Sequence, residues 1–252
     1  VAALEQTLGV SLFVRETRGM RPTPAGEVLL EYAERILALS DEARLAVSEA
    51  AGEGGVLRLA SMETTAALRL PPLLASFAAT HPRVALSLST GTSEGAGQSV
   101  VDRRASLAFV GGALGLARLA GAVAFVEELV LAVPAGVNSV EQANTRAMLV
   151  FRSGCAYRAR TENWFRHRGE PTSHVMEFGT LDGLLGCVGA GMGVTLLPRA
   201  VVERPHLAGQ VAALAIADGR VETWLIRHRD ARPTRAMEDF AALVSGVAAR
   251  AA

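Results

Sequence analysis

Three short polar turns carry the residues best suited to bind a small molecule. They are residues 61–65, 91–93 and 179–180, and each follows an apolar, strand-like run and precedes a helical pattern. In open α/β sheets, ligands bind beyond the carboxyl ends of the strands, where helix N-termini offer N–H groups that suit a carboxylate or another anion. Each hydroxyl taken alone could instead cap its helix. From these turns we predict the binding residues Ser61, Thr64, Thr65, Thr92, Ser93, Gly179 and Thr180.

Residues 151–155 add a possible counter-ion to this site. Arg152 would neutralise an anionic ligand, and we therefore also predict contacts from Arg152, Ser153 and Cys155. Cys155 lies near Arg152 and Arg158 at an expected helix start, where the arginines and the helix dipole would lower the pKa of a thiol. Cys155 is thus either a reactive thiol or a small residue that lines the cleft.

A second chemistry is suggested by residues 91–95, Gly-Thr-Ser-Glu-Gly, which match the G-x-S-x-G nucleophile elbow of serine hydrolases. The motif lies between a strand and a helix, and four histidines follow it in the sequence. Against this interpretation, only one strand precedes the strand that leads into the loop, and no oxyanion loop of the His-Gly-Gly type is present. A hydrolase using Ser93 is therefore the less favoured alternative to a polar turn that faces a cleft.

Other cofactor and metal chemistries find little support in the sequence. Residues 189–193, Gly-Ala-Gly-Met-Gly, follow a helical pattern and precede a strand, the reverse of a dinucleotide fingerprint, and they predict a tight turn. The five histidines are scattered, and no group of His, Cys, Asp and Glu has metal-ligand spacing. We therefore predict no metal and no cofactor.

Composition limits the remaining classes. The formal net charge is zero, so any contact with nucleic acid must be local. Two cysteines are too few for a disulfide scaffold. The sequence shows no cationic and apolar leader and no long uncharged apolar run, and these features predict a cytoplasmic protein without a membrane partner.

The elements that position these residues alternate between strand and helix from residue 56 onward, which predicts parallel sheets covered by helices. The region following the third strand shows further strand character before residue 134. A final helix covers residues 234–250. The expected strands are residues 56–60, 84–90, 107–110, 123–133, 147–151, 174–178, 194–197, 211–216 and 221–227. The expected helices before the last one include residues 98–104, 157–167 and 180–189.

Residues 4–26 precede this region and have the order helix end, hairpin, helix start. Gly9 is placed to cap a short helix, and residues 10–14 alternate as a strand before the turn at Thr17 and Gly19. Thr23-Pro24 then offers a capping hydroxyl and a proline at the first helical position. Three arginines surround the hairpin tip and could contact DNA: Arg15, Arg18 and Arg21.

A long helix is predicted from residue 24 to about residue 51. Its small and apolar residues recur at alternating intervals of four and three, which is a heptad seam. An amphipathic helix packed on its own domain is the alternative, but the narrow, long seam favours a dimer contact. Residues 52–55 then predict a flexible hinge. The seam residues of the dimer helix include Leu29, Tyr32, Ile36 and Leu39.

These motifs resemble those of the LysR-type transcriptional regulators. The matches are Leu4-Glu5, Leu8-Gly9, Leu12-Phe13, Arg15, Arg18-Gly19 and residues 23–26, Thr-Pro-Ala-Gly, together with the runs at residues 70–82, 154–165 and 178–198. The resemblance covers essentially the whole chain. The first two helices and the start of the recognition helix of the family's DNA-binding domain are expected before Val1.

The resemblance implies an α/β fold: a two-lobed effector domain like a periplasmic binding protein, preceded by a long linker helix and a partial winged helix-turn-helix. The implied domains are residues 1–23 from the DNA-binding domain, residues 24–51 as the linker helix and residues 52–252 as the effector-binding domain. Lobe I would comprise residues 56–134 and 228–252, and lobe II residues 135–227.

The implied function is a DNA-binding transcriptional regulator, not an enzyme, that assembles as a homodimer or homotetramer. A small molecule would close the cleft between the lobes and shift the oligomer toward another arrangement of its DNA-binding heads. The alternative is a stand-alone module that binds a small molecule without a DNA function. Because base readout requires the N-terminal half of the recognition helix, this chain by itself is expected to bind DNA weakly and without sequence preference.

Overall fold

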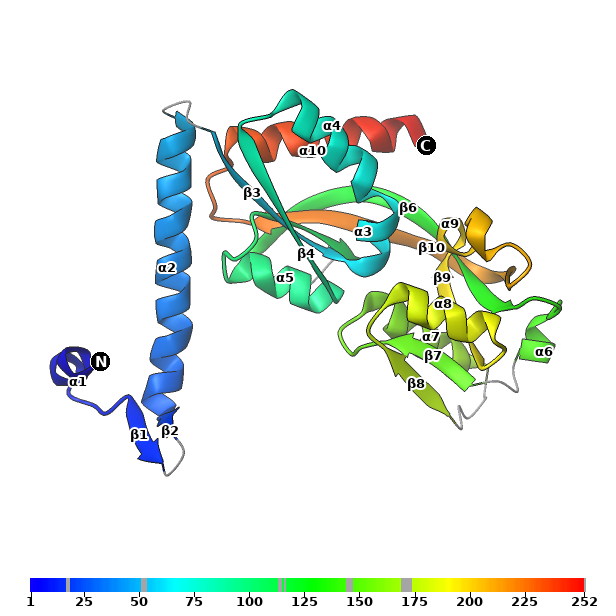
Figure 1. The fold of residues 1–252 in the computed structure, drawn as a ribbon, viewed down its shortest axis with the longest axis horizontal. Coiled ribbons are helices and arrows are strands. Elements are labelled where there is room, and N and C mark those ends of the chain that lie inside the picture. Colours follow the sequence, from blue (N-terminus) through cyan, green and yellow to red (C-terminus); the bar gives the residue numbers. More distant parts are fainter. Residues whose placement is uncertain are drawn as a thin grey trace. The chain divides into compact units, whose positions relative to one another are not determined.

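The computed structural model divides into two compact units, Val1–Gly52 and Glu53–Ala252 (Figure 1). Arg18 and the first half of the expected hinge, residues 52–53, lie outside the described residues. The structure describes residues 1–16, 19–50, 54–112, 115, 117–143, 147–168 and 174–251.

The first unit contains α1 (Ala2–Leu8), β1 (Phe13–Glu16), β2 (Gly19–Pro22) and α2 (Pro24–Ala50). Helix α1 ends at Gly9, whose φ of 70° lies in the left-handed region, as predicted. The Thr23 hydroxyl accepts a hydrogen bond from the N–H of Gly26 at 3.0 Å, which confirms it as a cap of α2. A Cβ at Gly26 would collide with the carbonyl oxygen of Leu12, so only glycine lets the helix approach the hairpin this closely.

The hairpin begins later than the sequence pattern predicted. Alternation from Val10 indicated a strand there, but the antiparallel pairing of β1 with β2 starts at Phe13. The reason is a contact with α1. The carboxylate of Glu5 accepts hydrogen bonds from the N–H groups of Leu12 at 2.7 Å and Phe13 at 3.3 Å, and it thereby fixes this segment as a connection.

Helix α2 leaves much of its predicted seam uncovered. Tyr32, Ile36 and Leu39 are 54%, 65% and 49% exposed, whereas Leu29 is partly buried. Isolated helices gain little from intrinsic propensity and usually depend on packing of an apolar face. The exposed seam is therefore a surface that a second helix could cover.

The second unit is built on a sheet with the strand order β4-β3-β5-β10-β6-β9-β7-β8. Its strands are β3 (Gly55–Met62), β4 (Val84–Gly91), β5 (Leu107–Gly111), β6 (Leu119–Pro134), β7 (Ala147–Phe151), β8 (Val175–Phe178), β9 (Gly193–Pro198) and β10 (Val211–His228). The three strands at each end of this order pair in parallel, whereas β6 and β10 pair antiparallel with each other and with their outer neighbours. The prediction of parallel sheets was therefore wrong for these two long strands.

Strands β6 and β10 connect the two halves of the unit (Figure 1). Residues 129–132 of β6 pair with β9, while residues 223–226 of β10 pair with β5. Strand β10 therefore joins the β4-β3-β5 group, β6 joins the β9-β7-β8 group, and the pairing of β6 with β10 makes the sheet continuous. The limits expected for the two lobes at residues 134 and 227 remain a proposal.

Strand β10 corrects the prediction of two strands at residues 211–216 and 221–227. The two segments form one strand with an irregular register between Ala215 and Arg220. Asp218 there has a φ of 55°, so the Asp-Gly sequence that resembled a turn is accommodated within the strand.

Two helix starts also differ from the predictions. Residues 61–65 were expected as a turn, but β3 continues to Met62 and the short helix α3 begins at Glu63. Helix α5 begins at Ser93 rather than near residue 98, because Thr92 caps it directly after β4.

Helices cover both faces of the sheet. Side chains of α4 and α10 pack with one face of β3 and β5, and α5 packs with the other. Helices α7 and α8 contribute to the core around β7 and β9. The helices of this unit are α3 (Glu63–Leu68), α4 (Leu70–Thr80), α5 (Ser93–Val101), α6 (Val140–Ala143), α7 (Ala156–His167), α8 (Leu181–Gly189), α9 (Arg199–Val202) and α10 (Arg235–Ala251), with the 3₁₀ turn η1 (Pro205–Leu207).

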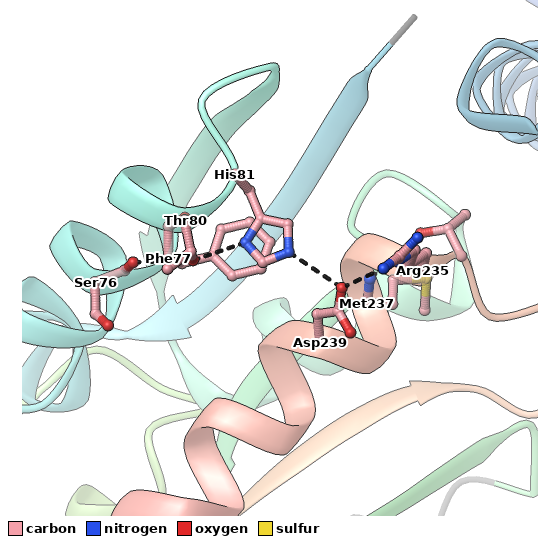
Figure 2. A network of polar contacts seen from close by, with 8 residues as sticks. Ser76, Phe77, Thr80, His81, Arg235, Met237 and Asp239 are labelled. Carbon is pink, nitrogen blue, oxygen red and sulfur yellow. Dashed lines mark hydrogen bonds and ion pairs between the residues drawn. The ribbon is translucent and has the colours of Figure 1, made fainter. Parts of the chain in front are cut away.

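The contact between α4 and α10 combines aromatic packing with a polar network (Figure 2). The Phe77 ring lies 5.4 Å from the Phe240 ring in a T-shaped arrangement, and the His81 ring stacks on Phe77 at 4.2 Å. His81 Nε2 lies 3.1 Å from the carboxylate of Asp239, and its Nδ1 lies 2.9 Å from the Thr80 hydroxyl. These contacts hold the last helix against the C-terminal end of α4.

The glycine-rich residues 189–193 form the predicted tight turn between α8 and β9. Gly191 has a φ of 81°, which L side chains rarely adopt. A Cβ at Gly193 would collide with the carbonyl oxygen of Ala147 on the neighbouring strand. Both glycines therefore serve backbone geometry.

Candidate functional site

A cavity of about 210 Å³ opens where four strands end. Its walls come from residues 62–64 at the end of β3, 90–92 at the end of β4, 151, 152 and 155 at and after the end of β7, and 178–179 at the end of β8. Pockets for drug-sized ligands typically measure about 300–1,000 Å³, so this cavity suits a smaller metabolite. The carboxyl ends of the parallel strands are the edge at which the sequence predicted a site.

Five of the ten predicted binding residues line this cavity: Thr64, Thr92, Arg152, Cys155 and Gly179. Ser93 and Ser153 instead line a neighbouring groove of about 570 Å³. Ser61 and Thr65 are buried next to the cavity wall, and Thr180 is exposed at the start of α8. A ligand contact for each of these residues stays a prediction.

Sequence reasoning missed several residues of the cavity wall, above all Glu63. Met62, Thr90 and Phe178 were also not selected, although they lie at the ends of the strands that the turns were chosen to follow. The signal for Glu63 was present, because it is an ionisable residue at the carboxyl end of a buried strand. The hydroxyls of the same turn gave a second signal, and the prediction rested on them alone.

The hydroxyls of two predicted residues cap helices. Thr92 Oγ1 accepts a hydrogen bond from the N–H of Gly95 at 3.1 Å, and Thr180 Oγ1 accepts one from Gly183 at 3.3 Å. Glu63 completes the second cap, because its Oε1 accepts the N–H of Leu181 at 2.8 Å. The protein itself therefore occupies N–H groups in the first turn of α8.

Arg152 is a charged residue of the cavity wall that has no ion pair among the described residues. Its guanidinium lies against Gly179, where an added Cβ would be 2.8 Å from Nη2. The Thr64 hydroxyl is buried and interacts with the buried hydroxyl of Tyr157. Arg152 is therefore the group of this wall that is best placed to pair with a ligand.

The environment of Cys155 differs from the prediction. Only 8% of this residue is exposed, and its burial raises the pKa of the thiol, with Arg158 and nearby backbone N–H groups acting in the opposite direction. Burial disfavours the charged thiolate more than the helix start and the arginines favour it. The predicted lowering of the pKa was therefore wrong, and the geometry is that of a cavity-lining residue.

We expect Cys155 to resist alkylation in the folded protein. In a Cys187→Ser variant at pH 8, iodoacetamide should modify Cys155 at least tenfold more slowly than in the unfolded chain, because the thiol stays protonated and largely covered. Mass spectrometry would follow the modification over time. A native rate equal to that of the unfolded chain would contradict this expectation.

Ser93 does not have the surroundings of a hydrolase nucleophile. Its hydroxyl is buried, accepts the N–H of Gly111 at 3.1 Å and lies 3.6 Å from the sulfur of Met62. A triad would require a histidine base within hydrogen-bond distance of this hydroxyl. The observed contacts instead join the start of α5 to the ends of β3 and β5.

Metal and membrane functions find no candidate in the described part of the chain. Among these residues, no three His, Cys, Asp or Glu side chains are grouped so as to hold a metal ion. No described helix combines the length and the apolar character needed to cross a bilayer.

Comparison with known families identifies both units. The LysR substrate binding domain matches residues 50–249, and the bacterial regulatory helix-turn-helix protein model of the lysR family matches residues 1–27. The chain belongs to the LysR family of transcriptional regulators. It is 38% identical over 245 residues to the HTH-type transcriptional regulator GltR of Bacillus subtilis (strain 168), covering 95% of this chain and 83% of GltR.

Solved structures of LysR-type regulators share the fold. Full-length CbnR complexed with its target DNA superposes with a TM-score of 0.60 at 24% identity, over 98% of this chain and 87% of CbnR. The effector-binding domain of QuiR in complex with shikimate superposes with a TM-score of 0.67 at 15% identity, over 78% of this chain and 98% of QuiR. The second unit is accordingly a two-lobed effector-binding domain.

The hairpin of this LysR-type regulator separates the predicted arginines. Arg15 pairs with Met20 and Arg21 with Val14, so the two arginines lie on opposite faces of the two-stranded ribbon. Arg21 also forms an exposed ion pair with Glu16 at 2.9 Å. Arg15 and Arg21 therefore do not share one cationic face, and DNA contact by any of the three predicted arginines stays a prediction.

Proposed function

We propose that this LysR-type regulator binds its effector in the 210 Å³ cavity and that binding changes the relative position of the two lobes. The main observation in support is that both parallel strand groups supply the cavity wall, β3 and β4 on one side and β7 and β8 on the other. A ligand that contacts both sides stabilises one lobe arrangement over others. The complex of QuiR with shikimate supports a small-molecule ligand in a domain of this fold.

Contacts across the cavity already join the two sides. The Glu63 carboxylate after β3 accepts the N–H of Leu181 in α8. In the neighbouring groove, the N–H of Glu94 in α5 donates to the carbonyl oxygen of Gly154 at 3.2 Å. A ligand inserted here competes with or reinforces these hydrogen bonds. The lobe arrangement is therefore open to control by a group the size of a metabolite.

The regulator would act on DNA as a homodimer or homotetramer through the hairpin and the helix that precedes it. The complex of CbnR with its target DNA supports the DNA partner. We infer a cytoplasmic location, because the regulator must reach the chromosome, and no enzymatic activity. The match of residues 1–27 to the helix-turn-helix family favours this function over a stand-alone ligand-binding module.

A thermal-shift screen of small carboxylic acids and aromatic metabolites on the full chain tests the cavity. A ligand at about 100 times its Kd should stabilise the protein by about 2.7 kcal/mol, which corresponds to roughly 5–10 °C for a domain of this size. Arg152→Gln should reduce the shift strongly, because it removes the cation of the cavity wall, and Thr64→Val should reduce it because it makes part of the same wall apolar.

Thr65→Val is the matched control, because Thr65 is the buried neighbour of Thr64 but does not line the cavity. A ligand whose stabilisation survives both Thr64→Val and Arg152→Gln would show that it binds elsewhere.

A further inference from the structure

The cavity presents opposite charges at one turn of the chain. Glu63 reaches Leu181 through its Oε1, and the Arg152 guanidinium lies against Gly179, two residues earlier. Two residues span at most about 7 Å of chain, so both charged groups reach the same short segment. They come from the two sides of the cavity, Glu63 after β3 and Arg152 after β7.

Glu63 and Arg152 form no ion pair with each other in the described residues, whereas Arg158 and Glu177 nearby form one at 2.6 Å. In the same part of the chain, the hydrogen bond found for the Glu63 carboxylate uses Oε1, so Oε2 can accept another. The cavity thus carries one carboxylate oxygen and one guanidinium that can each take a ligand group.

A ligand of a single charge would match only half of this arrangement. An anion would pair with Arg152 but would lie close to the Glu63 carboxylate, and a cation would meet the reverse situation. Anion binding at the start of α8 is also reduced, because Glu63 and the Thr180 hydroxyl already accept N–H groups of its first turn. The arrangement favours a ligand that carries both charges a few ångströms apart.

We propose that the effector is a small zwitterion of the α-amino acid class, with its carboxylate on Arg152 and its ammonium group on Glu63. This rests on the proposed function of the cavity. An ammonium group has three donors, and the Glu63 carboxylate on the cavity wall is a charged acceptor for it. Met62, Phe151 and Phe178 supply apolar wall for the ligand side chain.

The test uses matched ligands on the unmodified full chain. The twenty common amino acids are screened at 10 mM by thermal shift, and each hit is compared with the acid that lacks its amino group and the amine that lacks its carboxylate. We expect at least one amino acid to bind, measured by titration calorimetry, and both truncated analogues to bind at least tenfold more weakly. The comparison requires no variant, so it does not depend on the folding of a mutant.

Two variants then test which charged group of the ligand each residue contacts. Glu63→Gln keeps an amide oxygen for the N–H of Leu181 but loses the charge. It should weaken binding of the amino acid at least tenfold and leave binding of the acid analogue unchanged. Arg152→Gln should weaken binding of both the amino acid and its acid analogue. Glu162→Gln is the matched control, because Glu162 lines the neighbouring groove rather than the cavity, and it should leave the affinity unchanged.

The outcomes separate this proposal from the proposed function. Binding of organic acids that depends on Arg152, together with no binding of any amino acid, would overturn the zwitterion and keep the cavity as the effector site. Equal affinity of an amino acid and its acid analogue would overturn it as well. A ligand that is insensitive to Thr64→Val, Glu63→Gln and Arg152→Gln would overturn both the zwitterion and the cavity.

Discussion

Glutamate at both Leu29 and Ile36 is expected to reduce the mass of the protein in solution by about half. These residues lie one heptad apart on the seam of α2, and Ile36 is 65% exposed in the single chain. If two α2 helices pair through this seam, each new carboxylate would be buried without a partner, which costs several kcal/mol. Light scattering at equal concentrations would compare the variant with the wild type, whose chain mass is 26.3 kDa.

The control is the same change on another face of the same helix. Leu30 and Leu37 are also seven residues apart and are 52% and 68% exposed. Each lies one position beyond a seam residue, which rotates it by about 100° around the helix. Leu30→Glu/Leu37→Glu should leave the mass unchanged. Dissociation by this control alone would reject the seam, and an unchanged mass in both variants would place the association in the second unit.

Arg69→Met is expected to lower the free energy of unfolding by about 3 kcal/mol, because it leaves a buried carboxylate without its partner. The Arg69 guanidinium donates to both oxygens of Glu127, at 2.8 and 2.9 Å, and lies 5.5 Å from the centre of the Phe125 ring. The Glu127 side chain is only 6% exposed, whereas that of Arg69 is 33% exposed. For a unit of this size, thermal unfolding should shift by roughly 6–12 °C.

The next residue along β6 provides a matched control. Glu128 accepts from Arg199 at 2.8 and 2.9 Å in the same two-bond geometry, but both partners are solvent-accessible. Arg199→Met should therefore leave the melting temperature nearly unchanged, because exposed ion pairs contribute little. Adding Glu127→Gln to Arg69→Met should restore part of the stability. Equal shifts from Arg69→Met and Arg199→Met would contradict the role of burial.

The elements of the first unit could be predicted because their determinants are local. The Gly9 cap, the Thr23 hydroxyl on Gly26 and the start of α2 at Pro24 involve residues within four positions of one another. The same holds for the turn at residues 189–193, where Gly191 adopts a positive φ. Such signals act before any tertiary contact forms and can be read along the chain.

The partners of the strands could not be predicted in the same way. Alternation shows which side chains share a face but not which strand lies beside which. Residues 123–133 indicated a strand, yet its pairing with β10 on one side and β9 on the other was not visible. The irregularity at Asp218 likewise resembled a turn, because only a continuous neighbouring strand makes it part of β10.

For the site, the sequence by itself determined the edge of the sheet, and the tertiary structure decided which groups face the cavity. Thr64, Thr92 and Gly179 line the cavity, and they could be predicted because local sequence patterns mark the ends of strands. Glu63 and Leu181 lie 118 positions apart, and their hydrogen bond exists only because the two strand groups meet. The arginines near Cys155 were visible in the sequence, but the burial that raises the pKa of its thiol depends on the folded core to which Cys155 belongs. The sequence shows which residues carry a charge. Their desolvation and their pairing depend on which other residues the tertiary structure places next to them.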